Sequence, residues 1–235
     1  MKGVFYGVGV GPGDPELLTL KGYRVLREAD VICAPKSGAD REGVALSIIG
    51  EVIGQKKEVL ELSFPMTRER ARLELSWEKA AEQIVGLLRE GKKVAFVTLG
   101  DPTLYSTYTY LLKKIKQAGP WAVETVPGVP SFCACAALAG IPLAEGEEKL
   151  AVVPVIEDLD TVRFVCRHFE NVVFMKVAGK FAEVAAVLEE LGLKGQAVFA
   201  SRCGLTGSVV KTDLDKVEER HKDYLSLIIV KKVAK

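Results

Sequence analysis

The stretch MKGVFYGVGVGPGDPELLTLKG, residues 1–22, decides how the rest of the chain is organised. A β-favouring run, residues 4–10, leads into closely spaced glycines, then Asp14-Pro15 and an apolar periodic run. This pattern predicts a strand, a glycine-rich loop and a helix over residues 17–28, because Asp is a good N-cap and Pro suits the first helical turn. Glycines in such a loop let a ligand approach the backbone closely.

The glycine-rich loop fits neither of two common phosphate-binding motifs. G-x-G-x-x-G would need its last glycine at position 12, 14 or 16, where the chain has Pro12, Asp14 and Glu16. No G-K-[ST] follows, which excludes a P-loop. The loop is therefore expected to be functional, but not as a pyrophosphate site.

The bulk composition excludes several classes of protein. The 235 residues suit one large or two small domains, and a hydrophobic fraction of 49% supplies a core. Lys and Arg number 32 against 31 Asp and Glu, a balance that argues against a general nucleic-acid binder. No signal peptide is recognisable, and no apolar run approaches the roughly 18 residues of a membrane span. We therefore expect a cytoplasmic protein without nucleic-acid or membrane partners.

The cysteines and histidines point to neither a disulfide scaffold nor a metal site. The 5 cysteines form no C-x-x-C pair, and Cys133 and Cys135 lie in the small-residue run SFCACAALA, where we interpret them as buried small hydrophobes. The 2 histidines lie among charged residues. Without cysteine spacing or histidine partners, no protein-held metal is expected.

Hydrophobic periodicity predicts an α/β chain with two domains. In the first part, strands near 4–10, 29–34, 57–62, 93–99 and 121–126 alternate with helices over 17–28, 43–53, 67–89 and 103–118. In the second part, helices over 131–139, 160–168 and 181–191 accompany strands near 150–156, 171–175, 197–200, 209–210 and 225–230. We expect an N-terminal domain, residues 1–128, with a mostly parallel sheet and flanking helices, and a C-terminal mixed-sheet α/β domain, residues 129–235.

Three glycine- and proline-rich turns each follow a predicted strand: residues 11–15 (GPGDP), 100–102 (GDP) and 127–130 (PGVP). In open α/β sheets, ligands bind outside the carboxyl ends of the strands. One such turn would be a good helix start and no more, but three on one edge favour a site. Asp101 has two candidate roles, as a cap for the helix expected from Thr103 and as a hydrogen-bond acceptor for a ligand.

Four motifs in order resemble those of the tetrapyrrole (corrin/porphyrin) methylases: GVGVGPGDPELLTLKG (7–22), VTLGDPTLYST (97–107), VPGVPSFCACAALAGIPL (126–143) and VVFMK (172–176). The loop LSFPMT (62–67) and Trp77 resemble the branch that methylates C20 of precorrin-2 or cobalt-factor II. The resemblance implies a two-domain tetrapyrrole methylase fold, a homodimer, and a donor site in the cleft between the domains. It further implies S-adenosylmethionine as methyl donor, with S-adenosylhomocysteine as product, and a cyclic tetrapyrrole acceptor in cobalamin synthesis.

The resemblance also implies site residues, carried over position by position. The donor set is Pro12, Leu99, Gly100, Asp101, Leu104, Ser131, Phe132, Met175, Arg202 and Cys203. Beyond Cys203 the chain departs from the commoner pattern, with Gly207-Ser208 where a glutamine is usual. Because the acceptor carries carboxylates, basic and loop residues at the same edge are its candidates. That set is Gly13, Asp14, Lys36 and Lys176.

No catalytic side chain is assigned, since methyl transfer from a sulfonium is an in-line displacement that needs alignment more than a nucleophile or metal. Other functions remain open from the sequence. Within the family these are methylation of uroporphyrinogen III at C2 and C7, of another corrin carbon, of a modified histidine of a protein, or of ribosomal RNA, which the near-neutral charge disfavours. A non-catalytic nucleotide-binding module is the alternative from a different class.

Overall fold

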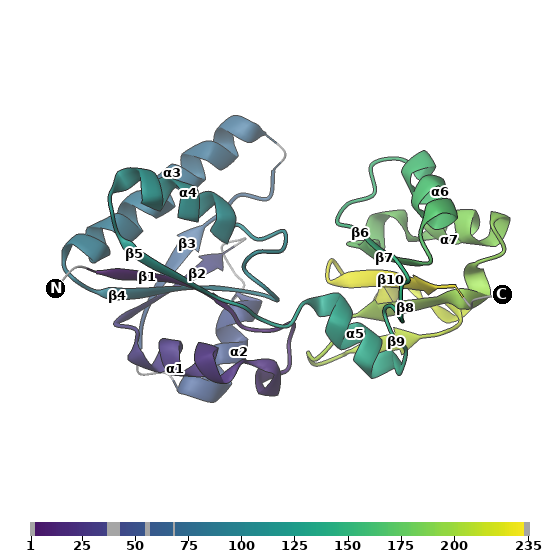
Figure 1. Ribbon diagram of the computed structural model, residues 1–235, viewed down its shortest axis with the longest axis horizontal. Coiled ribbons are helices and arrows are strands. Elements are labelled where there is room, and N and C mark those ends of the chain that lie inside the picture. The colour runs from purple at the N-terminus through teal and green to yellow at the C-terminus, as the bar shows by residue number, and fades with distance from the viewer. Residues whose placement is uncertain (1–2, 37–42, 55–56, 68, 233–235) are drawn as a thin grey trace. The chain divides into compact units, whose positions relative to one another are not determined.

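The computed structural model describes residues 3–36, 43–54, 57–67 and 69–232. They form two compact units, Met1–Pro130 and Ser131–Lys235, each built on its own five-stranded sheet (Figure 1). No helix within these described ranges is both long and apolar enough to cross a membrane.

The first unit is a parallel sheet with helices on both faces. Its strands are β1 (Val4–Gly9), β2 (Val31–Lys36), β3 (Glu58–Ser63), β4 (Lys93–Thr98) and β5 (Ala122–Val126), in the spatial order β3-β2-β4-β1-β5. Helices α1 (Leu20–Glu28) and α2 (Val44–Ile53) cover one face, and α3 (Arg70–Arg89) and α4 (Tyr108–Ala118) cover the other (Figure 1). From β1 the chain proceeds to β2 and β3, whereas from β4 it crosses to β5, so the order reverses between β4 and β1.

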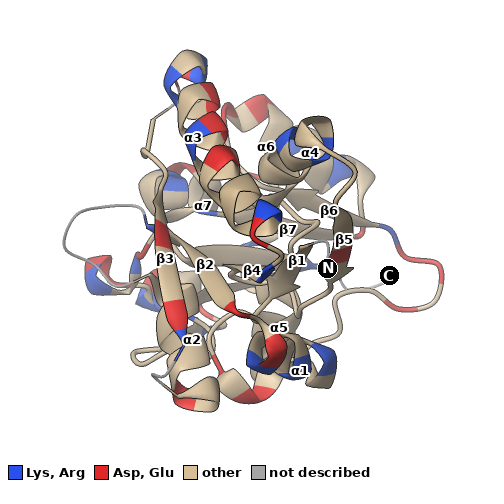
Figure 2. Ribbon diagram, turned by 90° about the vertical axis from the view of Figure 1, so that its left-hand side faces the viewer, with Lys and Arg blue, Asp and Glu red and all other residues tan. Residues whose placement is uncertain are grey.

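The core under α3 and α4 is aromatic and apolar. Phe5, Phe96 and Tyr108 are fully buried there, with ring centroids of Phe5 and Tyr108 5.8 Å apart. The buried hydroxyl of Tyr108 is hydrogen-bonded to Thr125 Oγ1 at 2.6 Å, which satisfies the one polar atom of the ring. Figure 2 shows acidic and basic residues mixed along α3.

The second unit has a mixed sheet, as its pattern of short strands predicts. Its strands are β6 (Leu150–Val153), β7 (Asn171–Met175), β8 (Ala197–Ser201), β9 (Val209–Lys211) and β10 (Ser226–Lys231), in the order β6-β7-β10-β8-β9. Among these described strands, only β6 and β7 pair in parallel, and the other pairs are antiparallel. Helices α6 (Leu159–His168) and α7 (Phe181–Glu190) bury one apolar face of the sheet, while α5 (Ser131–Ala139) contacts β9 and β10 on the other face (Figure 1).

Short 3-10 helices complete the described elements: η1 (Pro15–Leu17), η2 (Ala178–Lys180), η3 (Lys194–Gln196), η4 (Leu214–Lys216) and η5 (Glu219–His221). The predicted α/β fold class is confirmed, but the helix predicted over 17–28 is wrong at its start. Asp14 accepts from the backbone N–H of Glu16 and so caps η1, while Thr19 caps α1 by accepting from Gly22 N–H at 3.0 Å. A second N-cap therefore restarts the helix.

The helix predicted from Thr103 is also wrong at its start, since α4 begins only at Tyr108. Asp101 Oδ1 accepts from the backbone N–H of Thr103 at 2.8 Å and from its hydroxyl, and Ser106 Oγ accepts from Tyr108 N–H at 3.2 Å. Side chains that bond their own backbone two residues on favour turns over helix. Residues 101–107 are consequently a loop.

A polar cluster lies at the end of the second sheet where β7 begins and β10 ends. Glu148 lies just before β6 and accepts from Asn171 Nδ2 at 3.0 Å, from the Glu145 backbone N–H at 2.8 Å and from Lys231 Nζ. These donors, with Lys231 the largest contributor, lower the pKa of Glu148 to about 2. The carboxylate of Glu148, which is ionised in the folded state, thus attaches the segment before β6 to β7 and β10.

We expect Glu148 to make folding acid-sensitive. An unfolded Glu has a pKa of about 4.3, so the lowered folded value stabilises the fold above that pH, and the gain is lost as pH falls toward 2. In thermal unfolding between pH 5 and pH 2, the wild-type melting temperature should fall more steeply than that of Glu148→Gln. Glu147→Gln, which removes the same charge from the exposed neighbour, is the control and should follow the wild type. Parallel profiles for wild type and Glu148→Gln would contradict this.

Candidate functional site

The turns after β1, β4 and β5 meet at the carboxyl edge of the first sheet. The backbone N–H of Gly100 donates to the carbonyl of Gly11 at 2.8 Å, and the same two residues form an isolated bridge. Since β1 and β4 are the strands between which the order reverses, this contact lies at the switch point where open α/β sheets bind ligands. The predicted clustering of these turns is what the structure shows.

The three turns are packed backbone against backbone. A Cβ added to Gly9 would lie 2.5 Å from the carbonyl oxygen of Gly100 and 2.7 Å from the nitrogen of Gly128, and a Cβ on Gly128 would collide with the same carbonyl. Only glycine permits this approach. The glycines of the opening stretch therefore bring the turns together.

Asp101 connects the second turn to the third. Its Oδ2 accepts from the backbone N–H of Gly128 at 2.9 Å, while Oδ1 is used by Thr103. The predicted role of Asp101 as the cap of the following helix is wrong, because α4 starts only at Tyr108. The carboxylate instead bridges two loops. Hydrogen bonds to a charged acceptor are among the stronger ones in proteins, so this link fixes the relative position of the two turns.

A buried hydroxyl pair supports the loop from beneath. Thr98 Oγ1 and Ser106 Oγ are 2.8 Å apart, and both residues are buried. Burial also raises the pKa of Tyr108, against the smaller opposing effect of its hydrogen bond with Thr125, so its phenol is neutral and remains a hydrogen-bond donor. Sequence reasoning did not assign Thr98 or Ser106. Their signal was two hydroxyl residues on either side of the GDP turn, one at the end of an apolar strand and one in the loop before α4.

Lys36, a candidate for the acceptor, ends β2 at the same edge. Its Nζ donates to Glu61 of β3 at 2.6 Å, and both side chains are partly exposed. The neighbouring strand thus supplies a counter-charge that sequence reasoning missed. Such a pair presents its lysine N–H groups in a fixed place while limiting the net positive charge of the edge.

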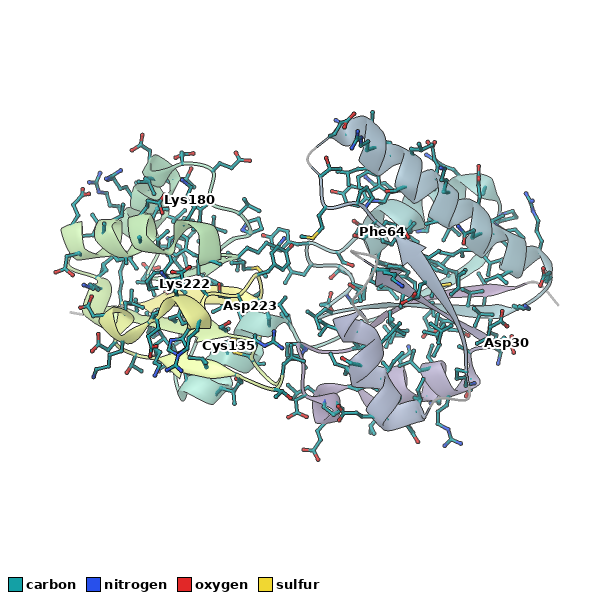
Figure 3. All side chains as sticks on the ribbon, turned by 180° about the vertical axis from the view of Figure 1, so that it is seen from behind. Asp30, Phe64, Cys135, Lys180, Lys222 and Asp223 are labelled. Atoms are coloured by element: carbon teal, nitrogen blue, oxygen red, sulfur yellow. A yellow bond between two sulfur atoms is a disulfide. The ribbon has the colours of Figure 1, made fainter. Side chains whose placement is uncertain are left out.

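The candidates of the second unit converge at one end of its sheet. Met175 is the last residue of β7 and Lys176 follows it, while Arg202 and Cys203 follow β8. Strands β7 and β8 lie on the two sides of β10. Lys176 Nζ lies 5.5 Å from the centre of the Tyr224 ring, and Arg202 Nη1 donates to Asp223 Oδ2 at 3.1 Å. Asp223, labelled in Figure 3, and Tyr224 precede β10 and were not assigned from the sequence. The two cations are held by one short segment.

Cys203 is joined to Cys135 by a disulfide, with Cα atoms 5.8 Å apart. The interpretation of Cys135 as a simple buried hydrophobe was therefore wrong, since 68 residues of separation hide such a pairing from local patterns. Ser131 and Phe132 open the same helix, α5, that carries Cys135 (labelled in Figure 3). The bond thus connects two segments that carry candidate donor residues.

The described residues offer no activated free cysteine and no metal cluster, since the pKa is raised in Cys133 as well as in the two cysteines below. Burial raises the pKa of Cys33 to about 12 and that of Cys166 to about 11, so both are neutral thiols. Among the residues that the structure describes, no group of three or more His, Cys, Asp or Glu is placed to hold a metal ion. The arrangement can bind and align ligands through backbone turns, one carboxylate and a few cations.

Comparisons with known proteins extend over almost the whole chain. A family model, Tetrapyrrole (Corrin/Porphyrin) Methylases, matches residues 4–218. A cobalt-precorrin-2 C(20)-methyltransferase of Salmonella typhimurium is 36% identical over 233 residues, covering 99% of this chain and 98% of that protein. A probable cobalt-precorrin-2 C(20)-methyltransferase of Methanocaldococcus jannaschii is 37% identical over 231 residues, covering 97% and 95%. The structure of a Thermus thermophilus uroporphyrin-III C-methyl transferase complexed with S-adenyl homocysteine is similar with a TM-score of 0.64 and 26% identity, covering 97% of this chain and 96% of that one.

We expect Asp101→Asn to be destabilising, unlike a change at a simple cap. If the amide oxygen keeps the bonds from Thr103, the amide N–H₂ faces the Gly128 N–H, and one hydrogen bond to a charged acceptor is lost. The free energy of unfolding in urea should fall by about 1–3 kcal/mol. Asp14→Asn is the matched control and should be nearly neutral, since Asn and Asp cap equally well. An Asp101→Asn protein as stable as the control would contradict the bridging role.

Proposed function

Because the chain belongs to the tetrapyrrole (corrin/porphyrin) methylases, we propose that it transfers a methyl group from S-adenosylmethionine to C20 of cobalt-precorrin-2 in cobalamin biosynthesis. The observation that carries the proposal is 36–37% identity, over nearly the full chain, to two relatives named for that reaction. The alternatives are the metal-free acceptor, precorrin-2, and cobalt-factor II. The names of those two relatives favour the cobalt-loaded precorrin.

The edge of the first sheet fits the methyl donor. Gly100 turns with φ +71°, and a Cβ added to it would have its nearest neighbours, Pro130 Cα and the Val129 carbonyl oxygen, at 3.9 Å, an ordinary van der Waals distance. The residues of this edge that would hold the donor are Pro12, Leu99, Gly100, Asp101 and Leu104. Asp101 Oδ1 accepts two hydrogen bonds and Oδ2 accepts one, which leaves one lone pair of Oδ2 for an ammonium or a ribose hydroxyl. When bound, S-adenosylmethionine supplies a methyl group already activated on a sulfonium sulfur.

What the chain itself contributes is alignment. The backbone-packed turns and the Asp101 link hold the donor loops in place before any ligand binds, which reduces the ordering needed at reaction. The candidates for binding the carboxylates and the edge of the acceptor are Lys36, Gly13, Asp14 and Lys176. Ser131, Phe132, Met175, Arg202 and Cys203 remain candidates for the donor in the second unit.

The reaction can be tested with the full chain, labelled S-adenosylmethionine and four acceptors in parallel: cobalt-precorrin-2, precorrin-2, cobalt-factor II and uroporphyrinogen III. We expect the label on C20 of cobalt-precorrin-2, located by NMR. Calorimetry should show binding of S-adenosylhomocysteine and none of NAD or ATP. Label on C2 or C7 would replace the assigned position, and nucleotide binding without transfer to any acceptor would indicate a non-catalytic module.

We also infer that the protein is a cytoplasmic homodimer. A C2 pair is the commonest assembly of soluble enzymes and the one that the resemblance implies. Sedimentation equilibrium at micromolar concentration should give a species of two chains. A species of one chain under those conditions would contradict the inference, whatever the methylation assay shows.

A further inference from the structure

Tyr105 combines an exposed ring with an unusual backbone. Its φ is +53°, in the left-handed region that bulky side chains rarely enter. Its side chain is also among the exposed large hydrophobics, with a relative exposure of 52%. A non-glycine residue in this region costs free energy, so the surrounding structure must hold its backbone there.

The loop around Tyr105 enforces that backbone from both sides. On one side, Asp101 holds Thr103 and reaches Gly128. On the other, Ser106 is buried and bonded to Thr98 and to Tyr108 N–H. Left-handed residues persist where the surroundings over-determine them, and they cluster at sites that bind ligands.

Non-glycine residues with positive φ are confined to the candidate segments. Within the described part of the chain they are Tyr105, Lys176 and Arg202, which follow β4, β7 and β8 respectively. Each lies in or next to a stretch already singled out for binding. Tyr110 offers a contrast, because it is 44% exposed but lies in regular α4 and stacks on Trp77 at 3.9 Å. An exposed ring on this unit therefore does not require a strained backbone.

We propose that the ring of Tyr105 stacks on a face of the tetrapyrrole acceptor and positions it beside the donor turns, an inference that rests on the proposed function. The acceptor is a broad ring with apolar faces and carboxylates at its rim. Lys36 ends β2, the strand next to β4, and Tyr105 lies in the loop that follows β4, so the same edge carries a cation and an aromatic ring. That combination matches the acceptor, whereas the adenine of the donor has no acidic rim.

Three substitutions of Tyr105 separate the effect of its ring from the effect of its backbone conformation. Tyr105→Phe keeps the ring, Tyr105→Leu removes it, and Tyr105→Asn removes it while tolerating a left-handed φ. With cobalt-precorrin-2 as acceptor, KM should rise about three- to tenfold in the Leu and Asn variants and stay within about twofold in Phe. The melting temperature of Tyr105→Asn should equal or exceed that of the wild type, and calorimetric affinity for S-adenosylhomocysteine should be unchanged in all three.

The matched control is Tyr110→Leu, which removes an exposed ring from the adjoining helix and should leave the KM of the acceptor unchanged. An unchanged KM in Tyr105→Leu and Tyr105→Asn would overturn the proposal, as would a loss of S-adenosylhomocysteine affinity at constant KM, which would place the ring on the donor. If the wild type transfers no methyl group, the proposed function fails. Titration of the same tetrapyrrole by visible absorbance then decides the inference alone, with equal binding by wild type and Tyr105→Leu overturning it.

Discussion

The close approach of Gly9, Gly100 and Gly128 is the constraint on which the first unit depends. Parallel strands deliver their carboxyl ends to one edge, but ordinary side chains would keep the following turns apart. Glycine at these positions lets the turns touch through their backbones, and Asp101 then links two of them through Gly128. The candidate donor loop is rigid because of contacts made within the unit, before any ligand arrives.

This arrangement explains why the sequence was informative about the edge and less so about the loop. Apolar strands followed by Gly- and Pro-rich turns identify a parallel α/β unit, and parallel strands necessarily bring those turns to one side. The start of α4 was misplaced because the bonds of Asp101 and Ser106 to nearby backbone outcompete helix formation over residues 101–107. Local helix propensity does not reveal that competition.

Contacts between distant residues account for the rest of what was missed. The carboxylate of Asp101 meets a backbone N–H 27 residues away, Lys36 meets Glu61 on the neighbouring strand, and the two cations of the second unit are held by Asp223 and Tyr224. Each partner is a common residue type in an unremarkable local pattern. Such pairs follow from strand order and register, which become known only once the sheet is formed.

The Cys135–Cys203 bond has a consequence for how the second unit is taken apart. It closes a covalent ring that runs from α5 through β6, α6, β7 and α7 to the end of β8, so this part of the chain stays looped even after its hydrogen bonds are broken. A force applied to the chain ends can straighten only the residues outside the ring. An ATP-driven protease that threads polypeptide must therefore either admit two polypeptide segments side by side when it reaches the disulfide, or wait for the bond to be reduced.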